Sequence, residues 1–166
     1  YRYFNEQQTT SLVQQYKALA ELFELQMTGT VGYPGWQPRF DTPLLATAPI
    51  YSRFDQLPRI AAADHLHPRD LLSTAKSIIV FYIPFKKYLV KENRKGERPC
   101  RNWGIAYVQT NDLIERLSQA LGNWLMERGY KSGLTPATHN FDAAKLMARW
   151  SHKHLAHLVN LGRFGV

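Results

Sequence analysis

The amino-acid sequence predicts a mixed α and β fold, α/β in class, in which helices pack around a small sheet. Residues 77–85, SIIVFYIPF, form a near-continuous apolar run, which is typical of a strand buried on both faces. Residues 103–128 contain a stripe of leucines four residues apart, which is typical of the core-facing side of a helix: Leu113, Leu117, Leu121 and Leu125. We therefore expect this long helix to pack on the sheet.

The first 60 residues predict one helix followed by an irregular arm. Apolar residues recur near helical spacing between Thr9 and Gln26, so a helix is expected there. Glycines and prolines then follow in close succession and argue against regular structure to about residue 50. The aromatic residues among them allow two interpretations, an arm laid over the core or a lid over a ligand. The core itself is expected in residues 61–166.

Short elements lead into the predicted strand. We expect a short helix over 54–63, interrupted by a proline, and one helical turn over 69–74, directly after Pro68. Between them, His65 and His67 have the spacing of two metal ligands that share one face of a strand. The neighbouring proline argues against a strand, so a turn without metal is the prediction.

A strongly basic segment follows the strand. Residues 86–101, KKYLVKENRKGERPCR, contain seven basic and two acidic side chains and predict a polar loop. Two interpretations stay open, a solvated loop and a loop that contacts nucleic-acid phosphates. The net charge of +8 allows the second, because residues 61–166 carry sixteen basic and eight acidic residues while 1–60 carry five of each. In that interpretation the contacts come from Lys91, Arg94, Lys95 and Arg98.

The last third of the chain predicts a ligand-binding region. After the long helix, residues 130–134 are expected to form a short second strand, and a last helix is expected to begin near residue 143. Asn140 or Asp142 precedes its first turn and is a candidate N-cap. The polar turn before this helix, its histidines and two late glycines together favour a flat, polar ligand.

The histidines of the last helix argue against a metal site. Each residue of a helix turns by about 100°, so His152 and His154 point in directions about 200° apart and cannot share a ligand. His154 and His157 are three residues apart and could share one. Because no third ligand has a matching spacing, we predict no metal. We expect one histidine to be buried and another to face a pocket.

Further observations limit the class of protein. Cys100 is the single cysteine, which excludes an internal disulfide and any cysteine-ligated iron–sulfur cluster held by this chain alone. No glycine-rich phosphate loop, nucleophile elbow or HExxH motif is present. No apolar run reaches the roughly 18 residues of a membrane-spanning helix, and no secretory signal is visible. We therefore expect a cytoplasmic protein.

Three stretches, HPRDLLSTAKSIIVFYIPF, NWGIAYVQTNDLIERLSQALGNWLMERGY and PATHNFDAAKLMARWSHKHLAHLVNLGRFGV, cover about residues 65–166. They resemble the epoxyqueuosine reductase-like iron–sulfur proteins, and WSHKHLAHLVNLGRFG is the most specific part. The chain resembles the 4Fe-4S double-cluster paralogues of this family more closely than the tRNA reductase itself.

The resemblance implies an N-terminal domain with a nitroreductase-like fold, shared with reductive dehalogenases. It also implies cobalamin as a cofactor and a ferredoxin-like module with two 4Fe-4S clusters, which we expect beyond residue 166. The characterised reaction of the family removes an epoxide oxygen from a modified tRNA base. We therefore expect the substrate-binding domain of an oxidoreductase that acts on tRNA or a small molecule. The alternative is a basic RNA-binding or interaction module without redox activity.

Two sets of site residues complete the prediction. The acidic proton donor of the family corresponds to Thr135 here, so we predict Asp142, and after it His152, as the proton donor. For cofactor binding, the turn, helix and glycine positions predict Tyr107, Thr138, His139, Asn140, Ser151, His154, Gly162 and Gly165.

Overall fold

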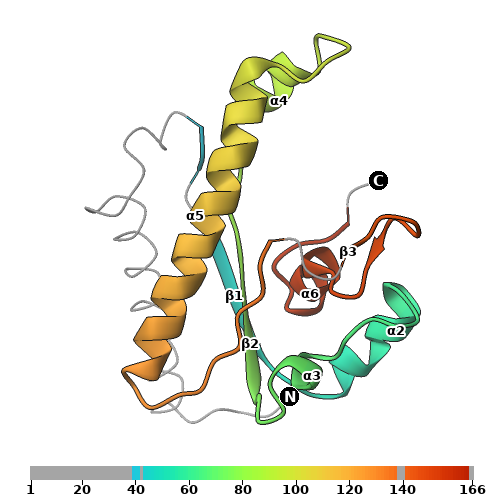
Figure 1. Cartoon of the computed structure of the whole chain (residues 1–166), viewed down its shortest axis with the longest axis vertical. Coiled ribbons are helices and arrows are strands. Elements are labelled where there is room, and N and C mark those ends of the chain that lie inside the picture. The colour runs from blue at the N-terminus through green and yellow to red at the C-terminus, as the bar shows by residue number, and fades with distance from the viewer. Residues whose placement is uncertain (1–38, 42, 138–140, 165–166) are drawn as a thin grey trace.

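The centre of the molecule is a two-stranded antiparallel sheet. The computed structural model describes residues 39–41, 43–137 and 141–164 (Figure 1). Strand β1 (Leu44–Pro49) pairs with strand β2 (Ser77–Tyr82) along its whole length. The helix predicted between residues 9 and 26 lies outside the described residues.

Strand β1 lies where glycines and prolines predicted no regular structure, and that prediction was wrong. The two nearest prolines flank the strand: Pro43 precedes it, and Pro49 is its last residue. Neither removes a hydrogen-bond donor from the middle of the ladder. The apolar stretch LLATA between them can therefore pair with β2.

Strand β2 confirms the predicted strand, and it ends at Tyr82, before Pro84. Beyond it, Phe40 and Phe85 form an isolated antiparallel bridge. The side chains of residues 78–81 are only partly buried. The expectation of full burial on both faces was therefore wrong, because two strands alone leave the edges of the sheet uncovered.

Short helical turns connect the two strands. The 3-10 helix η1 (Ser52–Gln56) runs into α2 (Leu57–Ile60), and α3 (Pro68–Leu71) follows after a turn. Helical turns are thereby confirmed in both predicted places, but they end earlier than predicted, at Ile60 and Leu71, and Pro58 lies in the first turn of α2 without interrupting it. His67 caps α3 in a reciprocal capping box, since its ring nitrogen accepts a backbone N–H of the first turn.

The basic segment was predicted to be a loop, and this was wrong for its first half. Helix α4 (Lys87–Asn93) forms there, and a turn then leads into α5 (Arg101–Met126). Leu89 is fully buried and belongs to the same core cluster as α5. This packing supplies the stabilisation that a helix of seven residues cannot supply by itself. The glycine and proline of the segment lie in the turn after α4.

The last third differs most from the prediction. The strand expected over 130–134 does not form, and these residues carry no regular structure. A hairpin of β3 (Phe141–Asp142) and β4 (Met147–Ala148) comes next along the chain. The last helix, α6 (His152–Leu158), begins well after the predicted start near residue 143.

Asp142 explains the late start of α6. Its carboxylate accepts the N–H groups of Ala144 (2.9 Å) and Lys145 (3.1 Å), which closes the turn of the hairpin. Leu146 then adopts a φ of 51°, in the left-handed region, which interrupts any right-handed helix. Asp142 therefore caps a turn, and the prediction that it caps the last helix was wrong; Ser151 does so.

Side chains alternate between the two faces of the sheet and divide the core into two clusters. On one face, Leu45, Ile79 and Phe81 pack against α5. The predicted leucine stripe is confirmed as the contact surface of that helix. Leu113, Leu117 and Leu121 are buried, and Leu125 is partly buried.

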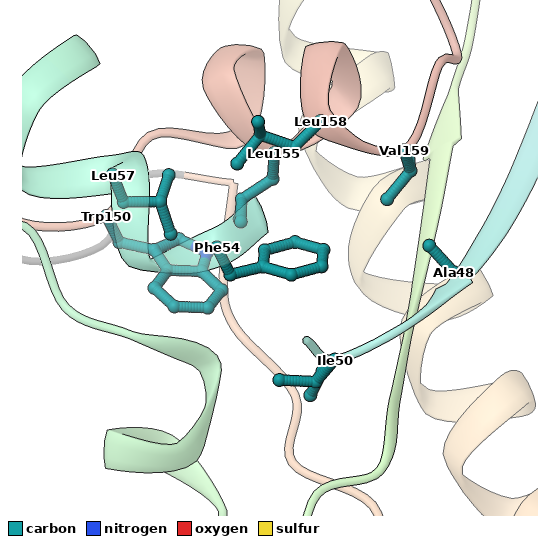
Figure 2. Close-up of a cluster of buried hydrophobic side chains, with 8 residues drawn as sticks. All are labelled: Ala48, Ile50, Phe54, Leu57, Trp150, Leu155, Leu158 and Val159. Atoms are coloured by element: carbon teal, nitrogen blue, oxygen red, sulfur yellow. The ribbon is translucent and has the colours of Figure 1, made fainter. Parts of the chain in front are cut away.

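The opposite face of the sheet packs against η1, α2 and α6. Figure 2 shows this second cluster, in which Phe54 and Leu57 approach Trp150 and Leu155. Helices thus cover both faces of a small sheet, as the sequence predicted. None of the helices in the described part of the chain is long and apolar enough to cross a membrane.

Candidate functional site

The α4 end of the molecule gathers most of the basic residues of segment 86–101. It lies at one extremity of the long axis, beyond the N-terminal end of α5 (Figure 1). Leu89 points into the core, so the opposite face of α4 points outward. That face carries Lys87, Lys91 and Arg94, spaced by four and three residues, and all three are exposed.

The turn after α4 extends this surface. Lys95 and Arg98 are exposed there, and Arg101 begins α5. We call the exposed cations of this region the basic tip: Lys87, Lys91, Arg94, Lys95, Arg98 and Arg101. The four residues predicted to bind nucleic acid are therefore brought together on one surface.

Local hydrogen bonds hold the turn of the basic tip in place. The Asn93 side chain at the end of α4 accepts the N–H of Cys100 at 3.0 Å, which joins the two ends of the turn. The Asn102 amide donates to both carboxylate oxygens of Glu92, at 3.2 and 3.3 Å. These contacts tie α4 to α5 at a place where no strand supports them.

The positive charge of the basic tip is largely uncompensated. Glu92 faces Asn102, and Glu97 is exposed without an ion pair to the basic residues described here. Lys86 pairs with Asp41, outside the tip. Within the described part of the chain, no carboxylate lies within salt-bridge distance of the cations predicted to bind nucleic acid: Lys91, Arg94, Lys95 and Arg98.

The start of α6 contains two residues predicted to bind a cofactor. The Ser151 hydroxyl lies 2.7 Å from His154 Nδ1 and also accepts the His154 N–H, at 3.5 Å. Burial lowers the pKa of His154, and the nearby charges of His65 and Lys153 lower it further. Ser151 and His154 therefore bond to each other, and this contact stabilises the first turn of α6.

Prediction from the sequence missed the role of His65. It is 5% exposed, and its Nε2 accepts the N–H of Ser151 at 2.8 Å, while its Nδ1 donates to the Leu66 carbonyl at 2.7 Å. Its ring stacks on Trp150 with centroids 5.9 Å apart. Burial lowers the pKa of His65, so the neutral ring is favoured. The sequence contained no signal for this contact, because His65 and Ser151 are 86 residues apart.

The outward histidine face of α6 is covered by a side chain of the same protein. The Phe164 ring lies 4.9 Å from the His154 ring and 5.4 Å from the His157 ring. Lys153 Nζ lies 4.6 Å from the centroid of the Phe164 ring. The side of these histidines where a flat ligand was expected is therefore in contact with the Phe164 ring.

The two predicted proton donors have different surroundings. Asp142 is half exposed in the hairpin turn, with Lys145 Nζ at 3.8 Å from its carboxylate. His152 Nε2 donates to the Pro136 carbonyl at 3.0 Å. Neither of these two contacts connects Asp142 with His152. As proton donors both remain predictions.

Of the remaining predicted cofactor residues, the two that the structure describes, Tyr107 and Gly162, belong to different parts of the fold. Tyr107 is exposed on α5, the helix on the opposite face of the sheet from α6. Gly162 has an ordinary φ, and a Cβ at that position would touch nothing within 4 Å. The others lie outside the described residues: Thr138, His139, Asn140 and Gly165.

The described members of this predicted cofactor set do not lie together on one surface, and cobalamin binding stays a prediction. Ser151 and His154 are engaged with each other, Phe164 covers the histidines, and Tyr107 comes from another face. The described residues contain no group of three histidine, cysteine or acidic side chains that could hold a metal ion.

No protein-family model, curated protein or solved structure matches this chain. The described fold and its surfaces define a mixed α and β domain whose most concentrated charged feature is the basic tip.

Proposed function

We propose that this chain binds RNA through the basic tip, as the substrate-binding part of a tRNA-modifying reductase that resembles epoxyqueuosine reductase. One observation supports RNA binding above all. The basic tip brings six cations onto one end of the molecule, and the four predicted to contact phosphates have no carboxylate partner among the described residues. Such a surface attracts a polyanion and releases counterions from it.

The positions of the basic side chains on α4 favour phosphate binding as much as their positive charge does. Lys87, Lys91 and Arg94 lie on one side of α4, and the buried Leu89 holds the other side against α5. Long basic side chains on a supported helix present their charges without first having to fold a loop. The helix thus positions these three cations before RNA binds.

The test of RNA binding is a salt titration with a variant of the basic tip. We expect the protein to bind tRNA with an affinity that falls steeply as salt rises. Alanine at Lys91, Arg94, Lys95 and Arg98 together should weaken binding and reduce the slope of log affinity against log salt. Each lost phosphate contact accounts for about one unit of slope.

A matched control removes the same charge elsewhere. Alanine at Lys131, Lys145, Arg149 and Lys153, which are all exposed, lowers the net charge equally and leaves the basic tip intact. This control variant should keep most of the affinity and of the slope. Equal losses in both variants would mean that net charge alone attracts RNA, and an unchanged slope in the tip variant would reject the basic tip as the binding surface.

The reductase part of the proposal rests on the resemblance of residues 65–166. Its test uses the full-length protein with any segment encoded beyond residue 166. Two cluster motifs with eight cysteines there, and the absorbance of bound cobalamin after reconstitution, would support it. In that protein, Asp142→Asn should reduce turnover if Asp142 donates the proton, and His152→Gln should do so if His152 does. Full turnover in both variants would assign the proton to another group. RNA binding without cobalamin and without clusters would instead support the alternative, an RNA-binding module without redox activity.

A further inference from the structure

An exposed tyrosine lies within the basic tip. Tyr88 is the second residue of α4 and is 45% exposed. On the helix it precedes Lys91 by three residues, so these two side chains lie on neighbouring parts of one face. Lys95 is exposed in the turn that follows the helix. Leu89, the residue after Tyr88, is the side chain of α4 that is buried in the core. Almost half of the Tyr88 side chain is therefore left in contact with solvent.

No ring among the described residues stacks on Tyr88. Phe85 and Trp103, the nearest aromatic residues in sequence on each side, pack on each other with centroids 5.1 Å apart. The face of the Tyr88 ring is thus available beside several positive charges. Proteins that bind single-stranded RNA combine these two elements, a basic surface for the backbone and an aromatic ring for a base.

We propose that Tyr88 stacks on an unpaired base of RNA whose flanking phosphates contact Lys91 and Lys95. This inference rests on the proposed RNA binding and narrows its ligand to RNA with unpaired bases next to a phosphate chain, such as a loop. In a duplex the bases are stacked inside the helix, and an aromatic side chain on a protein surface cannot reach their faces.

An anionic membrane would be another partner for a basic surface with an exposed aromatic ring. The geometry of α4 argues against it. A helix that lies on a membrane buries a continuous apolar face. On α4 the exposed apolar residues are Tyr88 and Val90, about 200° apart, and Leu89 between them points into the core. No such face exists on this helix.

The test compares two RNAs of equal length and charge, a hairpin with a single-stranded loop and a blunt duplex. Binding of the whole chain is measured by fluorescence anisotropy at several salt concentrations. Tyr88→Ala should weaken binding to the hairpin roughly 5- to 150-fold, the effect of losing one base–aromatic stack. It should leave binding to the duplex and the salt slope unchanged. Tyr88→Phe should bind the hairpin as the unaltered protein does.

Tyr130→Ala is the matched control, because Tyr130 is 61% exposed but lies far along the chain from the basic tip. It should bind both RNAs normally. Circular dichroism establishes that each variant is folded, and Tyr88→Trp offers a second ring that should retain hairpin binding.

The outcomes separate this inference from the proposed function. If Tyr88→Ala keeps full affinity for the hairpin while the fourfold alanine variant of the basic tip loses it, stacking is rejected and RNA binding stands. If the unaltered protein binds neither RNA, both are rejected. If it binds anionic phospholipid vesicles through Tyr88 and not RNA, the surface belongs to a membrane partner and the inference is overturned.

Discussion

His65 shows how one buried polar side chain connects distant parts of this chain. It joins the turn before α3 to the start of α6 through the Ser151 N–H. The bond to the Leu66 carbonyl requires a proton on Nδ1, so Nε2 is left as an acceptor. Protonation of Nε2 would place two donors against each other. The contact therefore requires the neutral ring.

A substitution can test this contact at high pH, where the ring is neutral. His65→Leu keeps a similar volume but leaves the Ser151 N–H without its acceptor, which should lower the free energy of unfolding by about 1–3 kcal/mol. The measurement is urea denaturation at pH 8. His157→Gln, which alters an exposed histidine, is the control and should change stability little. Equal stability of His65→Leu and the unaltered protein would show that water replaces the missing acceptor.

The pH dependence of stability follows from the same residues. Burial lowers the pKa of His65 and of His154 in the folded state below the ordinary value of 6.5, while the charge of Asp64 opposes the shift at His65. The unfolded chain therefore takes up protons first as the pH falls. Stability should be complete above about pH 6.5 and decrease below it, until the folded-state pKa values are reached.

Denaturation curves between pH 8 and pH 5 measure this dependence. In His65→Leu one of the two responsible groups is missing, so the decrease in stability should be smaller than in the unaltered protein. An equally steep decrease in the variant would assign the effect to His154 or to carboxylates.

At the scale of elements, α5 organises one side of the molecule. Its 26 residues contact the sheet through Leu113, Leu117 and Leu121, and its first turns support α4. Leu117 is 1% exposed and lies in the middle of this contact. Its side chain is thus the most informative one to remove.

Leu117→Ala should lower the free energy of unfolding by roughly 2–5 kcal/mol, because it removes apolar contact and leaves a cavity. Gln119→Ala, two residues further along and exposed, is the control and should stay within about 0.5 kcal/mol. Denaturation in urea measures both. A loss well below one kcal/mol for Leu117→Ala would contradict the packing of α5 on the sheet.

At the scale of the whole molecule, the sheet is too small to stand alone. A two-stranded hairpin is marginally stable in water and needs packing against other elements. Here α5 covers one face, and η1, α2 and α6 cover the other. The Arg53 guanidinium also donates to the Leu158 carbonyl at 2.7 Å, which joins η1 to the end of α6. Each side therefore depends on the other through the shared strands.

This dependence predicts that a substitution that weakens the packing on one face of the sheet also destabilises the helices on the other face. Leu155→Ala removes a 2% exposed side chain from the α6 side. Hydrogen exchange of backbone amides should then become faster in α5 as well as in α6, because both open in one cooperative unit. Faster exchange confined to α6 would show that the two faces open independently.

Some features of this protein were determined by local sequence patterns alone. The apolar run of β2 indicates a strand, and the leucine stripe of α5 indicates a helix. Burial gives each kind of element its own spacing of apolar residues, which the sequence displays directly. The concentration of positive charge after β2 was equally evident from the sequence. The residues of the predicted RNA contact are therefore identifiable from the sequence alone.

Other features were decided only by tertiary structure. Strand β1 forms because β2 supplies its hydrogen-bond partners, and α4 forms because Leu89 reaches the core beside α5. The start of α6 depends on the turn at Asp142 and on His65, which lies 86 residues before Ser151. Each of these depends on a contact between segments distant in sequence, and the free energy of such contacts is absent from any local pattern.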